Sequence, residues 1–362
     1  MEKMNKFIDC LIPIDHCNLK CEYCFVEQRP MNQQNARNEK YSPEFIGLAL
    51  SKNRLGGVCH FNISAEGETL IAPDIVSVLY QILAQGHYVM VVTNGTISKR
   101  FKEIIKLPKE YLSRLGFKFS FHYLELIRNN ILETFIDNVH LMDSNGVSTT
   151  IELMPHDELV PHIKDIKNIC EAKFGALCHV SVGRNEELRS MPLLTKYSRA
   201  EYSDIWSEFD SDLFRFKLST FNVKRTEYCY AGKWSGFVNL GTGEFMPCHG
   251  GEITQNIYED VNKPIKFIAI GRKCLTPHCI NSHAWLTCGL IPGMDGAPPY
   301  YDQVRDRKRK DGRSWLNEGM KINMRAKMYE ENMISSMAEQ YSDRLWYFYL
   351  TKLGKVKRRL FQ

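Results

Sequence analysis

The sequence contains no apolar run that approaches the roughly 20 residues needed to cross a bilayer. The apolar segment after the charged N-terminus begins at Phe7, ends at Asp15-His16, and has no small-residue cleavage site. These absences argue against a membrane span and against export. We therefore expect a cytoplasmic protein.

Strong charge of one sign is also missing. The net charge of the 362 residues is +5, and the acidic residues are spread along the chain, so charge gives no argument for nucleic acid. The only concentrated basic segments come late, at residues 305–310 and 352–359. RNA modification is kept as the last of the alternative functions, and it would require strongly salt-dependent RNA binding.

The chain has neither internal repeats nor low-complexity segments. With 44% hydrophobic and 25% charged residues, it has the composition of a soluble globular protein with one large domain or two. Twelve cysteines are present, of which three form one tight group and five a looser group. Without an export signal, ligation of metal by thiolates explains them better than a disulfide framework does.

Short apolar runs alternate with helical patterns in the first half, which predicts an α/β fold around a parallel sheet. Helices are expected from Pro43, from Pro73 to before Gly86, and before Asn145-Gly146, and a capping box at Ser198 predicts another through Trp206. Six strands are expected near residues 7–14, 58–63, 88–92, 117–121, 147–153 and 179–182.

Glycine, proline and cysteine become frequent after Cys229, and helical periodicity fades until about residue 312. We expect a loop-rich metal module there, followed by a helical tail. The predicted division is a barrel over 1–197, a bridging helix and linker over 198–224, an auxiliary module over 225–312 and a tail over 313–362.

The most informative motif is the Cys-x-x-x-Cys-x-x-Cys spacing of Cys17, Cys21 and Cys24, which follows the first predicted strand. Three thiolates hold three corners of a 4Fe-4S cluster and leave one iron open. A structural zinc site is the alternative, with His16 as the nearby fourth ligand. The sequence Cys-Asn-Leu-Lys-Cys-Glu-Tyr-Cys resembles the signature of the radical S-adenosylmethionine (radical SAM) superfamily.

This resemblance implies a partial (β/α)6 barrel, a 4Fe-4S cluster and S-adenosylmethionine (SAM) as cofactors. It also implies a set of SAM contacts. The residues at the matching positions are Tyr23 in the cysteine motif, Glu66, Gly67 and Glu68 after the second strand, Asn94 after the third, Ser120 and His122 at the fourth, Glu152 near the fifth and Arg184 near the sixth. Glu66 replaces a family glycine and His122 replaces a family aspartate.

The second cysteine group, from Cys229 through Gly243 to Cys248, resembles the opening of the SPASM and twitch auxiliary iron-sulfur modules. We expect Cys229, Cys248, Cys274 and Cys279 to hold a second iron-sulfur cluster, with a hairpin around residues 239–244. Zinc is the alternative metal. Cys288 is expected either as an alternative ligand or as a free thiol that donates a hydrogen atom to a substrate radical.

The resemblance implies an enzyme that reductively cleaves SAM and abstracts hydrogen from a carbon of its substrate, with the auxiliary cluster in electron transfer. We expect oxidation or epimerisation of a carbohydrate or other small substrate, because the first strand begins by about residue 7 and leaves no room for a leader-recognition domain. Peptide crosslinking or modification is the first alternative. A non-catalytic iron-sulfur or electron-carrier protein is the second. A reductant such as flavodoxin or ferredoxin is an implied partner.

The last residues combine aromatic side chains with a basic cluster. We expect a helix that packs on the barrel and ends in solvated charges, with docking on an anionic membrane as the alternative. The residues concerned are the apolar Tyr341, Leu345, Trp346, Phe348, Tyr349 and Leu353 and the basic Lys352, Lys355, Lys357, Arg358 and Arg359.

Overall fold

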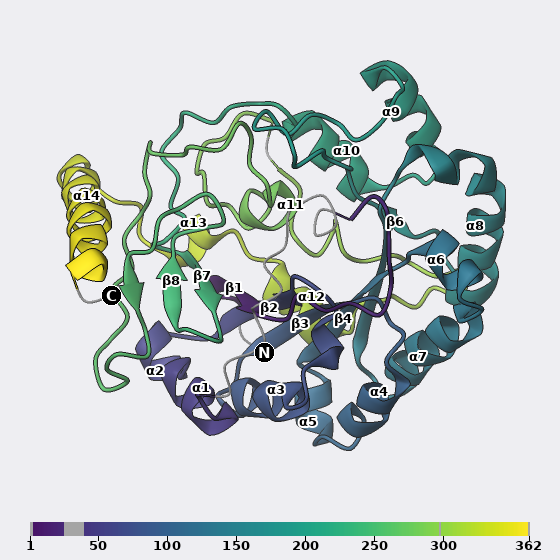
Figure 1. The fold of residues 1–362 in the computed structure, drawn as a ribbon, viewed down its shortest axis with the longest axis horizontal. Coiled ribbons are helices and arrows are strands. Elements are labelled where there is room, and N and C mark those ends of the chain that lie inside the picture. Colours follow the sequence, from purple (N-terminus) through teal and green to yellow (C-terminus); the bar gives the residue numbers. More distant parts are fainter. Residues whose placement is uncertain (1–2, 25–39, 297, 361–362) are drawn as a thin grey trace.

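The computed structural model describes residues 3–24, 40–296 and 298–360, with side chains up to Lys352. Within these residues, one curved sheet organises the chain, and its nine strands follow the order β6-β5-β4-β3-β2-β1-β7-β8-β9. Helices surround the sheet on its outer side, and loop-rich segments lie across the inner side (Figure 1).

Strands β1 to β6 lie where the sequence predicts six strands, and each pairs in parallel with the next. Six parallel strands with intervening helices form the predicted partial (β/α)6 barrel. Their bounds are β1 Lys6–Ile12, β2 Cys59–Ala65, β3 Tyr88–Thr93, β4 Leu115–Ser120, β5 Ser148–Leu153 and β6 His179–Val180.

Helices follow the strands in alternation, and the expected N-terminal caps are present. Ser42 accepts the amide N–H of Phe45 at the start of α1, and Ser198 and Glu201 form both bonds of a capping box at α9. The bounds up to the end of the barrel are α1 Pro43–Ala49, α2 Lys52–Leu55, α3 Ile75–Ala84, α4 Ser98–Ile104, α5 Lys109–Leu112, α6 Tyr123–Arg128, α7 Leu132–Ser144 and α8 Ile163–Ile169. Later helices are α9 Arg199–Ser207, α10 Asp212–Thr220, α11 Ser282–Trp285, α12 Glu318–Met324, α13 Met328–Glu331 and α14 Met337–Leu360.

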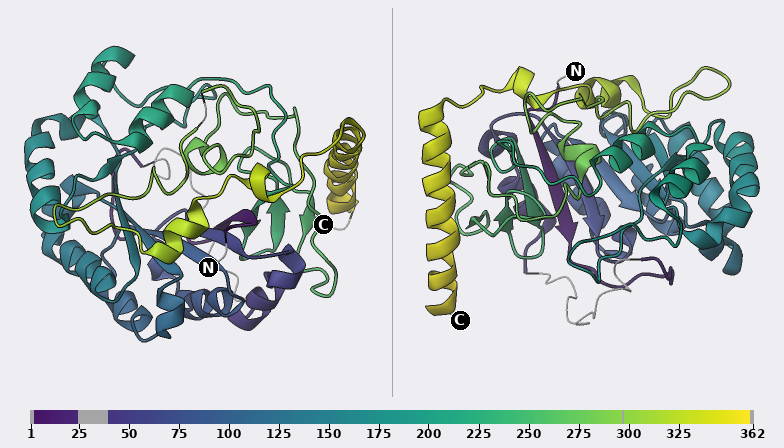
Figure 2. Two further views of the ribbon diagram at one scale, coloured as in Figure 1. Left: turned by 180° about the vertical axis from the view of Figure 1, so that it is seen from behind. Right: turned by 90° about the horizontal axis from the view of Figure 1, so that it is seen from above.

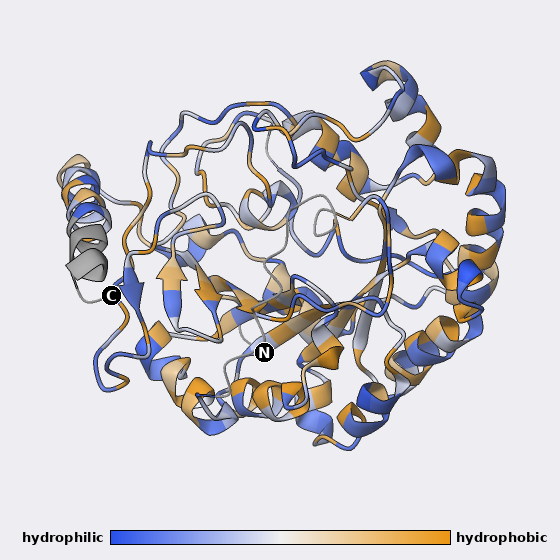
Figure 3. Ribbon diagram, in the orientation of Figure 1, coloured by the Kyte–Doolittle hydropathy of each residue, from blue (hydrophilic) through white to orange (hydrophobic). Residues whose placement is uncertain are grey.

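Successive side chains of a strand point to opposite faces of the sheet, so neighbouring residues belong to different hydrophobic cores. On β1, Ile8 belongs to the large core that the outer helices share, whereas Phe7 packs with Trp285 and Met320 in a second cluster. The central strands are mostly hydrophobic in Figure 3, and the surrounding helices carry both kinds of residue. Apolar side chains from residues 284–290, 301–304 and 316–328 thus pack on the inner side of the sheet near the amino ends of its strands.

The sheet continues beyond β1 into the segment predicted as an auxiliary module. Strand β7 (Ser235–Asn239) pairs in parallel with β1, and β8 (Glu244–Met246) and β9 (Gln255–Asn256) extend the sheet in antiparallel fashion. The sequence analysis predicts the hairpin but not its pairing with the first strand. The predicted domain division remains a prediction, and the loop-rich module shares its sheet with the barrel.

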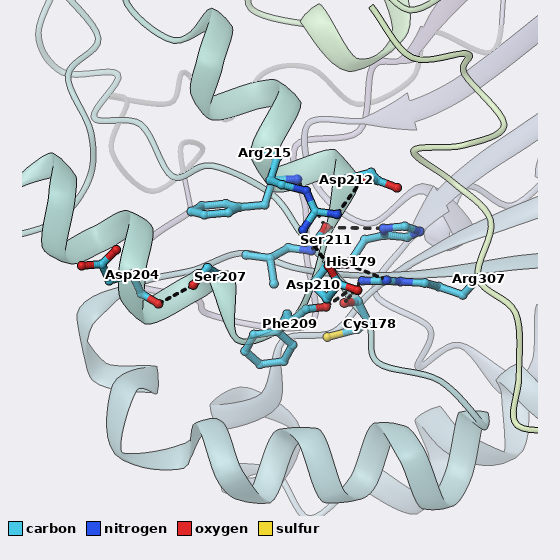
Figure 4. A network of polar contacts seen from close by, with 12 residues as sticks. Cys178, His179, Asp204, Ser207, Phe209, Asp210, Ser211, Asp212, Arg215 and Arg307 are labelled. Carbon is cyan, nitrogen blue, oxygen red and sulfur yellow. Dashed lines mark hydrogen bonds and ion pairs between the residues drawn. The ribbon is translucent and has the colours of Figure 1, made fainter.

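A polar network fastens the short strand β6 to the elements that follow it (Figure 4). Ser211, the N-cap of α10, accepts hydrogen bonds from the amides of Phe214 and Val180. Arg307 reaches from the C-terminal segment and donates to the backbone carbonyls of Phe209 and Asp210. These bonds compensate for a strand of only two residues at the sheet edge.

Helix α14 stands at the periphery of the molecule, beyond β8 and β9 (Figures 1 and 2). Tyr347 and Thr351 are buried on its inner side, so it packs on the remainder of the chain along one face. No helix among the described residues is long and apolar enough to span a membrane.

Candidate functional site

A cavity of about 700 Å³ opens at the carboxyl ends of the first five strands, where parallel barrels carry their chemistry. The loop after β1 supplies one wall, and the loops after β2, β3 and β4 supply the others. Its lining includes the three cysteines Cys17, Cys21 and Cys24 and these predicted SAM contacts: Tyr23, Glu66, Gly67, Glu68, Asn94, Ser120, His122 and Glu152. The structure therefore brings together residues that span 136 positions of the sequence.

The cysteine loop is held by its own backbone. The amide of Cys24 donates to the carbonyl of Cys21 at 2.9 Å, and the amide of Leu19 donates to the sulfur of Cys17 at 3.4 Å. Burial raises the pKa of the Cys21 thiol to about 12 and also raises the pKa of Cys17. A thiolate at these positions needs a cationic partner, which a bound metal would supply.

Gly67 sits where the loops after β1 and β2 touch. Its amide donates to the carbonyl of Ile14 at 2.6 Å, and a Cβ at this position would lie 2.0 Å from the carbonyl oxygen of His16. Only glycine permits this approach without backbone movement. The cysteine loop is therefore aligned by a residue of the second loop.

Glu68 joins the loops after β2 and β3. One carboxylate oxygen accepts hydrogen bonds from the Leu70 amide at 2.9 Å and the Thr93 hydroxyl at 2.6 Å, and the other accepts the Asn94 amide at 2.7 Å. Burial raises the pKa of Glu68, and these three hydrogen bonds oppose that rise. Glu68 thus organises the loop walls in addition to its predicted role toward SAM.

Asn94 contacts the cysteine loop directly. Its side-chain amide donates to the sulfur of Cys17 at 3.7 Å and to Oδ1 of Asn18 at 2.8 Å. Asn18 in turn donates to Thr96, so the Asn-Gly-Thr turn after β3 is tied to the motif after β1. Hydrogen bonds to ligand sulfurs are among the features that set the potential of an iron-sulfur cluster.

Tyr23 packs between two histidines on the cavity wall. Its hydroxyl lies 2.6 Å from Nδ1 of His122, and its ring stacks on His156 at a centroid distance of 4.1 Å. Burial lowers the pKa of both histidines to about 4, so both rings are neutral near pH 7. A neutral His122 serves as a hydrogen-bond partner for Tyr23 and not as a charged group in the cavity.

The deep end of the cavity carries buried charges that the sequence analysis missed. Glu152 accepts a hydrogen bond from Arg305 at 2.6 Å and lies 3.6 Å from the ammonium of Lys118. Burial alone would raise the pKa of Glu152, but these cations hold it well below its usual range. Lys118 falls in the otherwise apolar run of β4, and a charge inside a buried strand is the signal that could have identified it.

Lys217 lies behind this group on α10. Its ammonium donates to the hydroxyl of Ser181 at 2.6 Å, and burial lowers the pKa of Lys217 to about 7. Its positive charge helps to lower the pKa of Glu152. With a pKa of about 7, Lys217 can bind or release a proton near neutral pH.

Arg184 does not line the cavity. Its guanidinium is paired with Glu186 at 2.5 Å, and its backbone forms an isolated bridge with Leu193. The polar contact that the sequence analysis expected from the end of the sixth strand is directed instead into the loop that follows it.

The second cysteine group also lines a single cavity. Cys229, Cys248, Cys274 and Cys279 all border it, although they come from four separate segments. The β7–β8 hairpin lies between the first two, as predicted, and its Gly243 has a φ of +76° and packs against Tyr258 and Asn256. Burial raises the pKa of Cys248 to about 11 and raises the pKa of Cys229 and Cys279 as well.

Asp9 connects the barrel to this second cavity. The carboxylate lies on β1 with 1% of its surface exposed, and accepts hydrogen bonds from side chains of Asn62 at 2.8 Å and Asn281 at 2.9 Å. Asn281 belongs to the segment that follows Cys279. The sequence analysis did not single out Asp9, although it interrupts an apolar strand.

Cys288 lies in neither cavity lining. Its thiol is fully buried in the cluster that contains Phe7 and Tyr301, and burial raises its pKa to about 12. The carbonyl of Cys288 accepts the amide of Met328 at 2.8 Å. This location fits a core residue, and a role as ligand or hydrogen-atom donor remains a prediction.

The residues of the first cavity fit an iron-sulfur cluster with SAM by their donor chemistry. Three thiols come from one loop, an amide is directed at one sulfur, and Oδ2 of Asp15 is buried in the lining without a hydrogen-bond partner among the described residues. An unsatisfied buried acceptor can receive a donor from a bound molecule. In the part of the chain that the structure describes, no three His, Cys, Asp or Glu side chains converge closely enough to hold a single metal ion.

Comparison with known proteins supports the assignment of this region. Residues 11–168 match the family model of the radical SAM superfamily. No curated protein matches the chain.

Solved structures show a similar fold. SuiB from Streptococcus suis bound to SAM matches with a TM-score of 0.51 at 18% identity, over 70% of this chain and 63% of that chain. SuiB bound to its precursor peptide SuiA matches with a TM-score of 0.50 at 17% identity, over 70% and 62%. This chain therefore matches less than two thirds of the length of SuiB. Residues 11–168 are thus similar to the radical SAM superfamily model, and the chain shares its fold with the solved SuiB structures.

Proposed function

We propose that the protein is a radical SAM enzyme that abstracts hydrogen from a carbon of a carbohydrate or another small substrate. The observation that carries this proposal is the shared cavity of the Cys17, Cys21 and Cys24 loop with the polar residues at the ends of β2, β3 and β4. When bound there, a 4Fe-4S cluster and SAM would supply a 5'-deoxyadenosyl radical.

The protein's own residues would bind and orient the cofactors. The three cysteines would hold the cluster, and Asn94 would donate a hydrogen bond to the sulfur of Cys17. Glu66, Glu68 and Ser120 would contact SAM, and the Glu68 hydrogen bonds keep the surrounding loops in place before the cofactor arrives. Preorganised polar groups of this kind cost no rearrangement at the moment of reaction.

The substrate would occupy the deep end of the cavity. Lys118 and Glu152 line it there, and both offer hydrogen-bonding groups suited to hydroxyl, amino or carboxylate substituents. This favours a polar small molecule. The peptide alternative is supported by SuiB, a protein of similar fold that has been solved with a precursor peptide.

The second cysteine cavity would hold an auxiliary cluster on Cys229, Cys248, Cys274 and Cys279. Four thiols around one space suit this role. The auxiliary cluster would accept an electron from the substrate or relay one inward, and a flavodoxin or ferredoxin would supply the electron that starts the reaction.

Anaerobic reconstitution with iron and sulfide, followed by SAM and dithionite, tests the proposal. We expect 5'-deoxyadenosine to form with the wild-type protein and not with a Cys17→Ala, Cys21→Ala, Cys24→Ala variant. A protein that holds its first cluster, as shown by iron and sulfide counts, but forms no 5'-deoxyadenosine would be an electron carrier instead. Deuterated substrates that transfer deuterium into 5'-deoxyadenosine would then identify the substrate class.

A further inference from the structure

Helix α14 presents large apolar side chains to solvent along one face. Tyr341, Leu345, Phe348 and Tyr349 are 61%, 53%, 60% and 53% exposed. Leu345, Phe348 and Tyr349 follow Tyr341 by four, seven and eight positions, so all four side chains lie on one stripe of the helix. We call these four residues the outer stripe.

The opposite face fixes the helix on the protein, so the outer stripe cannot turn inward. The hydroxyl of Tyr347 accepts the amide of Glu252 at 3.2 Å, and Thr351 is 3% exposed. Asp343 accepts hydrogen bonds from Tyr228 at 3.0 Å and from Lys233 at 3.3 Å. Both views in Figure 2 show α14 at the edge of the molecule with open space on its outer side.

Charge along the helix has one sign after Asp343. Residues 344–362 contain six lysines and arginines and no aspartate or glutamate. Lys352, which continues the spacing of the outer stripe, is exposed. The helix therefore combines aromatic and aliphatic side chains on its outer face with a cationic C-terminal part.

This combination matches the chemistry of a membrane surface. Tyrosine and phenylalanine bury their rings at the boundary between headgroups and acyl chains, while lysine and arginine pair with anionic headgroups. The outer stripe is convex, as a single helix must be, and a planar lipid surface accommodates a convex helix without a matching groove. The excess of positive charge selects anionic over neutral lipid.

We propose that α14 docks the protein peripherally on anionic lipid membranes, with the outer stripe in the interface and the basic end against the headgroups. This goes beyond the proposed function and does not depend on it. It keeps the packed helix that the sequence predicts and adds the membrane docking that the sequence analysis gives as the alternative, because only one face of the helix packs on the rest of the chain.

The test is co-sedimentation of the reconstituted full chain with vesicles of phosphatidylcholine alone and with about one third phosphatidylserine. We expect binding to the anionic vesicles, weakened by salt, and little binding to the neutral ones. A Leu345→Ser, Phe348→Ser, Tyr349→Ser variant should bind roughly tenfold or more weakly, because it loses apolar area at the interface. A Lys352→Glu, Lys355→Glu variant should lose a similar factor on the anionic vesicles alone.

The matched control removes three exposed apolar side chains elsewhere, as Leu48→Ser, Ile127→Ser, Leu188→Ser, and should bind like wild type. All variants should keep wild-type formation of 5'-deoxyadenosine and wild-type circular dichroism. Absence of binding to both vesicles, or equal loss in the control, would overturn the proposal. Sedimentation of the wild type as a dimer that the stripe variant dissociates, without vesicle binding, would make the stripe an interface between two copies.

Discussion

The Asp9 carboxylate accepts a hydrogen bond from Nε2 of His249 at 2.8 Å. Asp9 lies on the first strand of the barrel, and His249 directly follows Cys248 in the second cysteine cavity. One buried side chain of the barrel thus positions two segments that carry cysteines of the other group, because Asn281 donates to the same oxygen.

Replacing Asp9 by Asn should lower the free energy of unfolding by about 2 kcal/mol, since an amide offers one acceptor oxygen where the buried carboxylate offers two. Its NH2 group must then face the donor of Asn62 or those of His249 and Asn281. Urea unfolding measures this loss. Iron content after reconstitution should also fall, because the cysteines of the second cavity lose their support. The control Asp212→Asn breaks an exposed pair with Arg215 and should change stability by less than about 1 kcal/mol. Equal effects in the two variants would contradict a positioning role for Asp9.

Gly67→Ala should misalign the cysteine loop. The added Cβ would meet the backbone carbonyl of His16 at 2.0 Å, and backbone cannot yield as a side chain does. We expect weaker SAM binding, measured by isothermal titration calorimetry, and a lower yield of 5'-deoxyadenosine. Gly116→Ala is the comparison, because the nearest atoms there belong to the flexible Met90 side chain. Wild-type SAM affinity in Gly67→Ala would show that the loops adjust freely.

Asn94→Ala should lower the reduction potential of the first cluster. The lost amide donates to the Cys17 sulfur, and such a donor stabilises the more negative, reduced state. A difference of about 1 kcal/mol corresponds to a shift on the order of 40 mV for one electron. Redox titration followed by electron paramagnetic resonance measures it. Asn138→Ala removes an amide that holds Gly95 of the same loop without contacting sulfur, and it should leave the potential unchanged.

His87 should make the protein less stable in acid. Its Nδ1 accepts the Cys59 amide at 3.1 Å, its Nε2 donates to the Leu50 carbonyl at 3.0 Å, and burial lowers its pKa to about 4. Between pH 6.5 and 4 the unfolded chain binds a proton that the folded protein does not, so stability falls as the pH falls through this window.

From pH 7 to pH 5 the His87 contribution to this loss is about 2 kcal/mol. His87→Gln removes the titrating group, and its free energy of unfolding in urea should therefore fall less over this interval than that of wild type. Identical pH dependence in the two proteins would show that His87 does not carry this linkage.

The six barrel strands and the main helices could be predicted because their signals are local. Neighbouring residues alone predict the Ser198 capping box and the helix start at Pro43. Apolar composition and turn signals predict the strands. The three-cysteine motif and its polar neighbours were predictable because each follows a strand, and parallel strands end at one side of a barrel.

Contacts between distant segments could not be predicted in this way. The pairing of β7 with β1 and the bond from Arg305 to Glu152 depend on how the chain returns to the barrel after residue 225. No local sequence pattern predicts where these later segments pack on the barrel. Arg305 reads in sequence as part of a solvated basic run, and in the structure it is 2% exposed.

The place of β1 between β2 and β7 has a consequence for synthesis on the ribosome. Phe7 pairs with residue 235, so one edge of the first strand stays unpaired until the ribosome has added about 230 more residues. At 5–20 residues per second that interval is on the order of tens of seconds. Throughout it, the nascent chain exposes an apolar strand edge ready to join other chains, and a chaperone able to shield it would raise the yield of correctly folded protein.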